Sequence, residues 1–124
     1  MPVLYHGTDV HSALFILNHG LNSEYLLALQ RRPSQLGIGL YTSVDVSVAW
    51  FFASMAPGNR GQGYTVIEMS VSEQHYRLLV AKNWALERAI VNVPFAAIQV
   101  WFHVDSFSFL NLYADFRPCN LQEK

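Results

Sequence analysis

Leu4-Tyr5-His6-Gly7-Thr8 and Gly37-Ile38-Gly39-Leu40-Tyr41-Thr42-Ser43 are the two stretches that decide the fold of this chain. In both, apolar residues surround polar side chains, and each stretch is followed by a segment with helical spacing. Short runs of this kind are typical of strands. The sequence therefore predicts two strands, over residues 3–6 and 39–42, and each leads into a helix.

Both helices begin or end at residues that favour helix ends. Asp9 is a good N-cap for the first helix, and Gly20 stands where that helix should end. Ser43 is expected to cap the second helix, with Asp45 in its first turn. The apolar positions are Val10, Ala13, Leu14 and Leu17 in the first helix and Val44, Val48, Phe51, Phe52 and Met55 in the second. Residues 23–32, before Pro33, predict a further short helix or an ordered loop.

Strands dominate the second half of the chain. They are predicted over residues 64–72, 88–93, 98–104 and 107–116, with a turn at 57–63. Residues 73–83 fit neither pattern clearly, so their assignment stays open. The prediction is an α+β fold with its helices mainly in the N-terminal half, in a single domain over residues 1–124.

The composition favours a folded protein and excludes some functions. Of 124 residues, 52% are hydrophobic and 14% charged, which is enough for a core of its own. The formal net charge of −1 does not supply the basic face that a general nucleic-acid binder needs. Cys119 is the one cysteine, so no intrachain disulfide can form. We expect no signal peptide, and no apolar run approaches the roughly 20 residues of a membrane span. A cytoplasmic protein is therefore predicted.

His6, Tyr41 and Glu87 are residues with which a chain can clamp NAD and break its nicotinamide–ribose bond. Cleavage develops positive charge on the ribose, as in glycoside hydrolysis. A carboxylate that faces this charge lowers the barrier, typically by about 3–4 kcal/mol. An aromatic ring holds the nicotinamide, and a histidine fixes the ribose. Gly7 lets the backbone approach the ligand closely, because glycine has no Cβ.

These motifs resemble the ADP-ribosyltransferase superfamily. The resemblance rests on His6-Gly7-Thr8 before a helix that ends at Gly20-Leu21, and on Gly39-Leu40-Tyr41-Thr42-Ser43 with Ala49 and Ala53 downstream. The match is to the His–Tyr–Glu branch, which poly(ADP-ribose) polymerases share with diphtheria-type toxins. It extends over about residues 3–104. It implies a split β-sheet core, NAD as the substrate and no metal.

The resemblance also implies roles for individual residues. His6 would bind a ribose, Gly7 would bind the nicotinamide amide through its backbone, and Tyr41 would stack on the nicotinamide. Glu87 would stabilise the cation, which makes Glu87, His6 and Tyr41 the catalytic set. Phe52 would be a second aromatic ring that stacks on the ligand. Phe51 would take this role if the spacing shifts by one residue. The implied cofactor-binding set is His6, Gly7, Thr8, Tyr41, Ser43, Ser47, Phe52 and Arg31, the last as a phosphate contact.

Glu68 and Glu73 are the alternatives to Glu87. Glu68 lies within a strand that resembles a non-catalytic strand of the polymerases, and Glu73 falls where no family strand is expected. Glu87 opens an apolar run that ends at Pro94, much as in the relatives. Ala85 stands where arginine-specific relatives carry an acidic or amide residue, so modification of arginine is disfavoured.

The implied function is NAD-dependent mono-ADP-ribosyl transfer to a macromolecular acceptor, either protein or nucleic acid. An NAD glycohydrolase would use the same site with water as the acceptor. A domain that binds NAD or another nucleotide without catalysis is the third interpretation. A small toxin or effector of this kind would be inhibited by a partner protein that plugs its pocket.

Three other functions fit less well. Gly37-Ile38-Gly39 begins like a dinucleotide fingerprint, but Thr42 stands in place of its third glycine. The five histidines show no zinc spacing, and there is no second cysteine to help. An RNA 2′-phosphotransferase shares the broader fold but needs several basic residues that this chain lacks.

Overall fold

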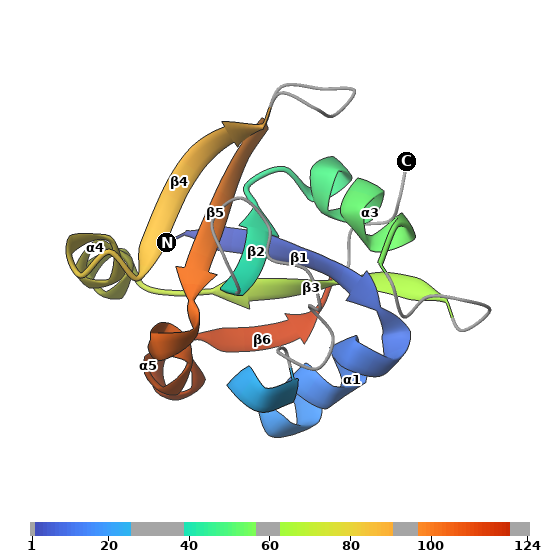
Figure 1. The fold of residues 1–124 in the computed structure, drawn as a ribbon, viewed down its shortest axis with the longest axis horizontal. Helices are drawn as coiled ribbons and strands as arrows, with labels where there is room; N and C mark the ends of the chain where they lie inside the picture. Colours follow the sequence, from blue (N-terminus) through green and yellow to red (C-terminus); the bar gives the residue numbers. More distant parts are fainter. Residues whose placement is uncertain (1, 26–38, 57–62, 91–96, 120–124) are drawn as a thin grey trace.

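The computed structural model describes residues 2–25, 39–56, 63–90 and 97–119, and the protein is α+β, as predicted. The strands are β1 (Val3–Asp9), β2 (Gly39–Ser43), β3 (Tyr64–Ser70), β4 (Ala85–Ile90), β5 (Ala97–His103) and β6 (Asp115–Pro118). The helices are α1 (Val10–His19), α3 (Val46–Ser54), α4 (Glu73–Ala81) and α5 (Phe107–Tyr113), with a short 3₁₀ helix, η1 (Val104–Ser106), before α5 (Figure 1). Within these ranges no helix combines the length and the apolar character needed to cross a membrane.

The described strands form one six-stranded sheet in the order β4-β5-β2-β1-β3-β6, and every neighbouring pair is antiparallel. β1 pairs with β3 along its whole length. β1 and β2, in contrast, share a single residue pair, Tyr5 with Ser43. In Figure 1, β4, β5 and β2 run steeply across the direction of β1, β3 and β6. The sheet is therefore continuous but narrow at the β1–β2 junction, where its two halves diverge.

The ends of the first two helices follow from local side chains. Asp9 caps α1 by accepting a 2.9 Å hydrogen bond from the Ser12 amide, and Gly20 ends the helix with a φ of 78°. Both assignments are confirmed. The cap of α3 is Asp45, whose side chain accepts a bond from the Ser47 amide, and the prediction that Ser43 caps this helix is wrong. Ser43 is still part of β2, because it pairs there with β1 and β5.

The second half contains more helix than the sequence predicts. Residues 73–83, whose assignment the sequence leaves open, contain the helix α4. The helix α5 occupies residues for which a strand is predicted. Phe107 and Leu110, about one helical turn apart, are both buried, and this spacing outweighs the strand preference of the aromatic residues. Of the strand predicted over residues 107–116, only residues 115–116 form a strand, as the start of β6. Residues 57–62 and 91–93, in the predicted turn and strand, lie outside the described residues.

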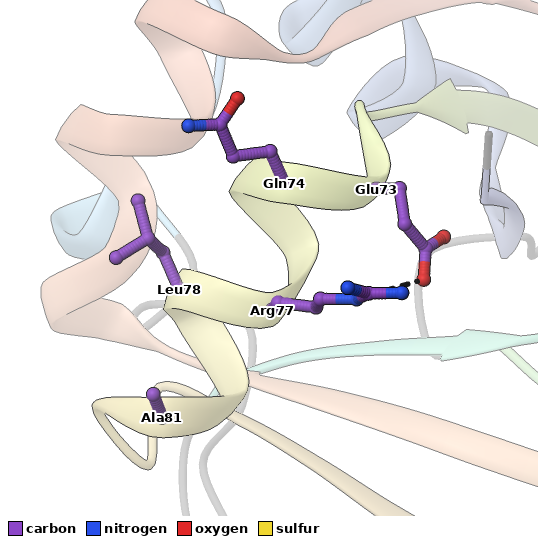
Figure 2. Close-up of a pocket in the computed structure, with 5 residues that line it drawn as sticks. All are labelled: Glu73, Gln74, Arg77, Leu78 and Ala81. Atoms are coloured by element: carbon purple, nitrogen blue, oxygen red, sulfur yellow. Dashed lines mark hydrogen bonds and ion pairs between the residues drawn. The ribbon is translucent and has the colours of Figure 1, made fainter.

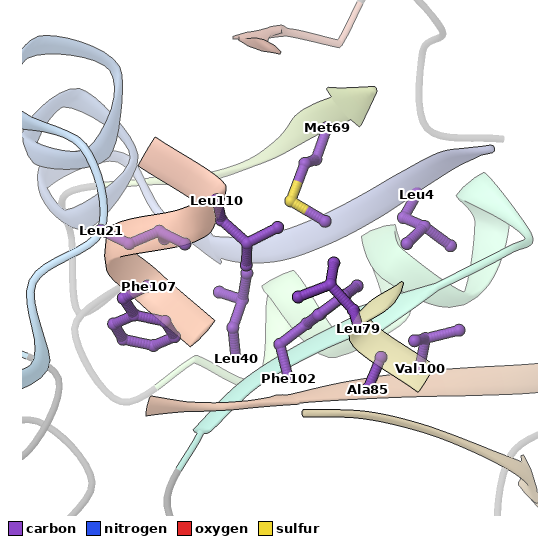
Figure 3. Close-up of a cluster of buried hydrophobic side chains, with 10 residues drawn as sticks. All are labelled: Leu4, Leu21, Leu40, Met69, Leu79, Ala85, Val100, Phe102, Phe107 and Leu110. Atoms are coloured by element: carbon purple, nitrogen blue, oxygen red, sulfur yellow. The ribbon is translucent and has the colours of Figure 1, made fainter. Parts of the chain in front are cut away.

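The two faces of the sheet carry separate packing. The larger cluster comprises Leu4, Leu21, Leu40, Met69, Leu79, Ala85, Val100, Phe102, Phe107 and Leu110 (Figure 3). We call the face that bears Leu4 and Leu40 the core face. On the opposite face, Ala49 and Ala53 of α3 pack against Val66 of β3, and we call it the α3 face. Two strand residues can therefore line the same pocket only if their side chains lie on the same face of the sheet.

Candidate functional site

β1 presents adjacent residues to opposite faces. Leu4 belongs to the core face, and successive strand residues alternate, so His6 and Thr8 point to the core face as well. Gly7 lies on the α3 face, since a Cβ placed there would meet the backbone of Ala49 and Ala53. The two neighbouring residues His6 and Gly7 of the first motif therefore lie on opposite faces of the sheet.

His6 is held by the second motif. Its Nδ1 lies 2.7 Å from the carbonyl oxygen of Tyr41. A carbonyl only accepts, so Nδ1 carries the proton and donates, which leaves Nε2 as an acceptor on the neutral ring. Burial lowers the pKa of His6, and the bond to Tyr41 and the charge of Asp9 offset this only in part. At neutral pH the imidazole is therefore uncharged, with a fixed tautomer.

The imidazole borders a cavity of about 40 Å³, which we call the His6 pocket. It lies between β1, β2, α1 and the segment after α1. His6, Thr8, Ser12 and Asn22 contribute polar groups, and the remaining wall is apolar or aromatic. The lining residues are His6, Thr8, Ser12, Phe15, Ile16, Leu21, Asn22, Tyr25, Leu40 and Phe107.

Stacked aromatic rings form one wall of the His6 pocket. The ring centroids of Phe15 and Tyr25 are 4.1 Å apart and their planes are within 8° of parallel. The Tyr25 hydroxyl lies 3.2 Å from Oγ of Ser12. A planar ligand can stack on such a surface, whatever its polar substituents. Ligand sites usually measure roughly 300–1,000 Å³, so a nucleotide needs the Tyr25 side chain to move from this position.

Asp9 fixes the polar groups next to His6. It accepts hydrogen bonds from the Thr8 hydroxyl at 3.3 Å and from the Ser12 amide at 2.9 Å. Burial alone would raise the pKa of Asp9, but the bonds from Ser12 and Thr8 outweigh it and lower the pKa. Asp9 is therefore a charged carboxylate that orders Thr8 and Ser12.

The side chain of Tyr41 lies on the α3 face. Tyr5 shares that face with Gly7 and pairs with Ser43, so Tyr41, two residues before Ser43, points the same way. On the neighbouring strand β5, Tyr41 pairs with Trp101. The structure therefore brings His6 to the backbone of Tyr41, while the phenol belongs to the other side of the sheet from the His6 pocket.

The structure does not bring Glu87 to this site. Glu87 pairs with Val100 and lies two residues after Ala85, which places its side chain on the core face. There its carboxylate accepts a short hydrogen bond from the hydroxyl of Tyr76 in α4. Burial, together with this contact and the negative charges of Glu87 and Glu73, raises the pKa of Tyr76 far above its ordinary value. Arg88, not Glu87, is the β4 residue that shares the face of the Tyr41 ring.

Three further residues of the implied set belong to β2 and α3. Ser43 is buried and lies opposite Tyr5. The backbone amide of Ser47 donates a 2.8 Å bond to Asp45 in the first turn of α3. Phe52, also in α3, is half-buried. None of these three lines the His6 pocket, whereas Thr8 does.

Several pocket residues were not anticipated. Ser12 and Phe15 lie one turn apart on the side of α1 that lines the pocket, but a serine and a phenylalanine at this spacing carry no motif that marks a ligand site. Tyr25 lies in residues 23–32, for which the sequence predicts a short helix or an ordered loop, and Asn22 precedes that segment; packing alone brings both here. Arg31, the predicted phosphate contact, lies outside the described residues.

A larger, shallow hollow of about 450 Å³ lies on the exposed side of α4 and shares no lining residue with the His6 pocket (Figure 2). Its polar groups are the side chain of Gln74 and the ion pair of Glu73 and Arg77, with 3.3 Å between Oε1 and Nε. An exposed pair one helical turn apart contributes little. We therefore take the His6 pocket as the candidate site.

No three His, Cys, Asp or Glu side chains in the described ranges gather in a way that could hold a metal ion. Compared with known proteins, the chain matches no protein-family model, no curated protein and no solved structure. The geometry of the His6 pocket and its surroundings is therefore the basis for proposing a function.

Proposed function

We propose that this chain is an NAD-binding domain of the ADP-ribosyltransferase type, with mono-ADP-ribosyl transfer to a macromolecule as its reaction. The observation that carries the proposal is the 2.7 Å hydrogen bond from His6 Nδ1 to the Tyr41 carbonyl. This bond joins the two motifs of the sequence at the junction where the halves of the sheet diverge. A split sheet of that superfamily would open at the same place.

The chemistry of the His6 pocket suits the adenosine half of NAD. Phe15 offers a flat aromatic surface for a purine ring once the Tyr25 ring, which stacks on it, moves away. His6 Nε2 is an acceptor for a ribose hydroxyl, and Thr8 and Ser12 add hydroxyl groups beside it. The pocket carries no basic side chain among its described lining residues, so phosphate binding falls to groups beyond it.

The nicotinamide half belongs to the α3 face in this proposal. The Tyr41 ring lies on that face, whereas the backbone of Gly7 is covered there by the backbone of α3. Because the sheet is continuous there, NAD with its adenosine beside His6 and its nicotinamide beside Tyr41 would require β1 and β2 to separate at their single residue pair. Recognition of NAD is the part of the function that the geometry supports best.

One observation favours a second candidate, a domain that binds NAD without cleaving it. Cleavage builds positive charge on the ribose and is helped by a nearby carboxylate. Glu87 faces the core side and bonds to Tyr76. On the face of Tyr41, β4 presents Arg88 in place of a carboxylate. Without movement of β4, binding is therefore favoured over cleavage.

Hydrolysis of NAD by water would use the same groups as transfer, so an NAD glycohydrolase is part of the same proposal. The proposal also includes a protein or nucleic acid as the acceptor, an inhibitory partner that fills the pocket, and a cytoplasmic location. All of these depend first on whether NAD binds.

Calorimetric titration with NAD, followed by separation of nicotinamide, free ADP-ribose and labelled acceptor, tests the proposal. We expect saturable binding that His6→Ala abolishes. Labelled acceptor would identify a transferase, free ADP-ribose a glycohydrolase, and binding without nicotinamide release the second candidate. A folded wild-type protein that binds no NAD would refute the proposed function.

A further inference from the structure

Asn111 in α5 binds both backbone groups of Leu21, a residue far away in the sequence. Its Oδ1 accepts a hydrogen bond from the Leu21 amide at 2.8 Å, and its Nδ2 donates to the Leu21 carbonyl at 2.9 Å. An amide side chain satisfies a peptide group in this way only when the two lie in nearly the same plane. The contact is thus a two-point clamp on the chain just after α1.

The sequence around Leu21 is adapted to this clamp. Gly20 has a φ of 78°, a conformation that side chains other than glycine rarely adopt. A Cβ at Gly20 would lie 2.8 Å from Oδ1 of Asn111, closer than real Cβ contacts. Gly20 therefore both ends α1 and leaves the space that Asn111 occupies.

The clamped segment is a wall of the His6 pocket. Leu21 is buried in the core and lines the pocket, and Asn22, which follows it, lines the pocket as well. The side chain of Asn22 accepts a 3.0 Å bond from the Tyr25 amide, and Tyr25 stacks on Phe15. Fixing the backbone of Leu21 therefore fixes the start of the segment that carries the aromatic wall.

We propose that Asn111 is a positioning residue for the nucleotide site, which it shapes through Leu21 without touching the ligand. This inference rests on the proposed function. α5 contributes to the site in a second way, because Phe107 lines the pocket directly. The pocket is thus shaped by a helix near the other end of the chain, which the N-terminal motifs do not reveal.

The test compares variants of the full chain by calorimetric titration with NAD. Asn111→Leu keeps the approximate volume and removes both hydrogen bonds, and about tenfold weaker binding is expected. Asn111→Asp keeps the acceptor and loses the donor, and an intermediate loss is expected. Leu112→Ala on the same helix, where Leu112 is 76% exposed, should bind as the wild type does.

Loss of stability alone is controlled by Leu79→Val. Leu79 is fully buried on the core face but does not line the pocket, so this variant should be less stable with unchanged affinity for NAD. Wild-type affinity in Asn111→Leu, or in Asn111→Asp should the leucine variant not fold, would overturn the inference.

Hydrogen exchange separates this inference from the proposed function. The Leu21 amide donates to Asn111, so Asn111→Leu should speed exchange in the peptide that contains residues 21–25, while Leu112→Ala should not. If the wild type binds no NAD, the proposed function fails and the clamp is judged by exchange alone. Unchanged exchange in that peptide would show that Asn111 does not hold it.

Discussion

Replacement of Gly7 by alanine tests how closely β1 packs against α3. A Cβ at this position would lie 2.8 Å from the Ala53 nitrogen and 2.9 Å from the carbonyl carbon of Ala49, and closer still to the Ala49 oxygen. Ordinary Cβ contacts begin at about 3.4 Å. All three atoms belong to the α3 backbone, so no change of rotamer relieves the clash, and the helix must move away from the strand.

The cost of this movement sets the size of the prediction. Overpacking a core by one methyl group typically costs 1–3 kcal/mol, and a rigid backbone neighbour places Gly7→Ala at the upper end, about 3 kcal/mol. For a domain of this size that corresponds to a fall in Tm of roughly 10–15 °C. Urea denaturation followed by tryptophan fluorescence should show a lower midpoint with an unchanged slope.

Gly63→Ala is the matched control. Gly63 has a φ of 85°, but the nearest atom to an added Cβ, Cγ2 of Val10, is at 3.4 Å. Its alanine variant therefore bears the conformational cost alone, about 1 kcal/mol. A Gly7→Ala protein no less stable than Gly63→Ala would refute the close packing of α3 on β1, and with it the assignment of Gly7 to the α3 face.

Other predictions concern the pocket and its surroundings. Because burial lowers the pKa of His6 in the folded state, the unfolded chain takes up that proton first, so stability should fall as the pH drops below about 6.5. The urea midpoint should fall less steeply with decreasing pH in His6→Asn than in the wild type. The same pH dependence in both proteins would contradict the burial of His6. Asp9→Ala should cost about 1 kcal/mol of stability by loss of the α1 cap, and no loss would show that the cap is dispensable. Glu87→Gln should leave the affinity for NAD unchanged in calorimetry, since its carboxylate faces the core side; a large loss would place Glu87 at the ligand. Phe15→Ala should weaken NAD binding about tenfold by loss of stacking, and an unchanged affinity would exclude the aromatic wall.

Local signals predicted much of the fold. Asp9 and Gly20 define α1 because cap and stop residues act within a few residues of themselves. The same reasoning placed the cap of α3 at Ser43 rather than Asp45, since pairing of Ser43 across the sheet is not visible locally. α5 was predicted as a strand because its aromatic residues favour strands, and only packing onto the core selects the helix.

The candidate site was predictable in part. His6 follows from its motif, but its partner, the Tyr41 carbonyl, is a backbone group that no residue type reveals. The face of Glu87 depends on the register of β4 against β5, and a shift of one residue would exchange it with Arg88. Asn22, Tyr25 and Asn111 join the site through tertiary packing alone.

The most direct test of NAD recognition is a titration of the ¹⁵N-histidine-labelled protein with NAD, observed by NMR at the imidazole nitrogens. If the ribose binds beside His6, Nε2 of His6 should shift in a saturable way, while Nδ1 stays protonated through its bond to Tyr41. Saturation that perturbs only His11, His19, His75 or His103, or no saturation at all, would contradict binding in the His6 pocket.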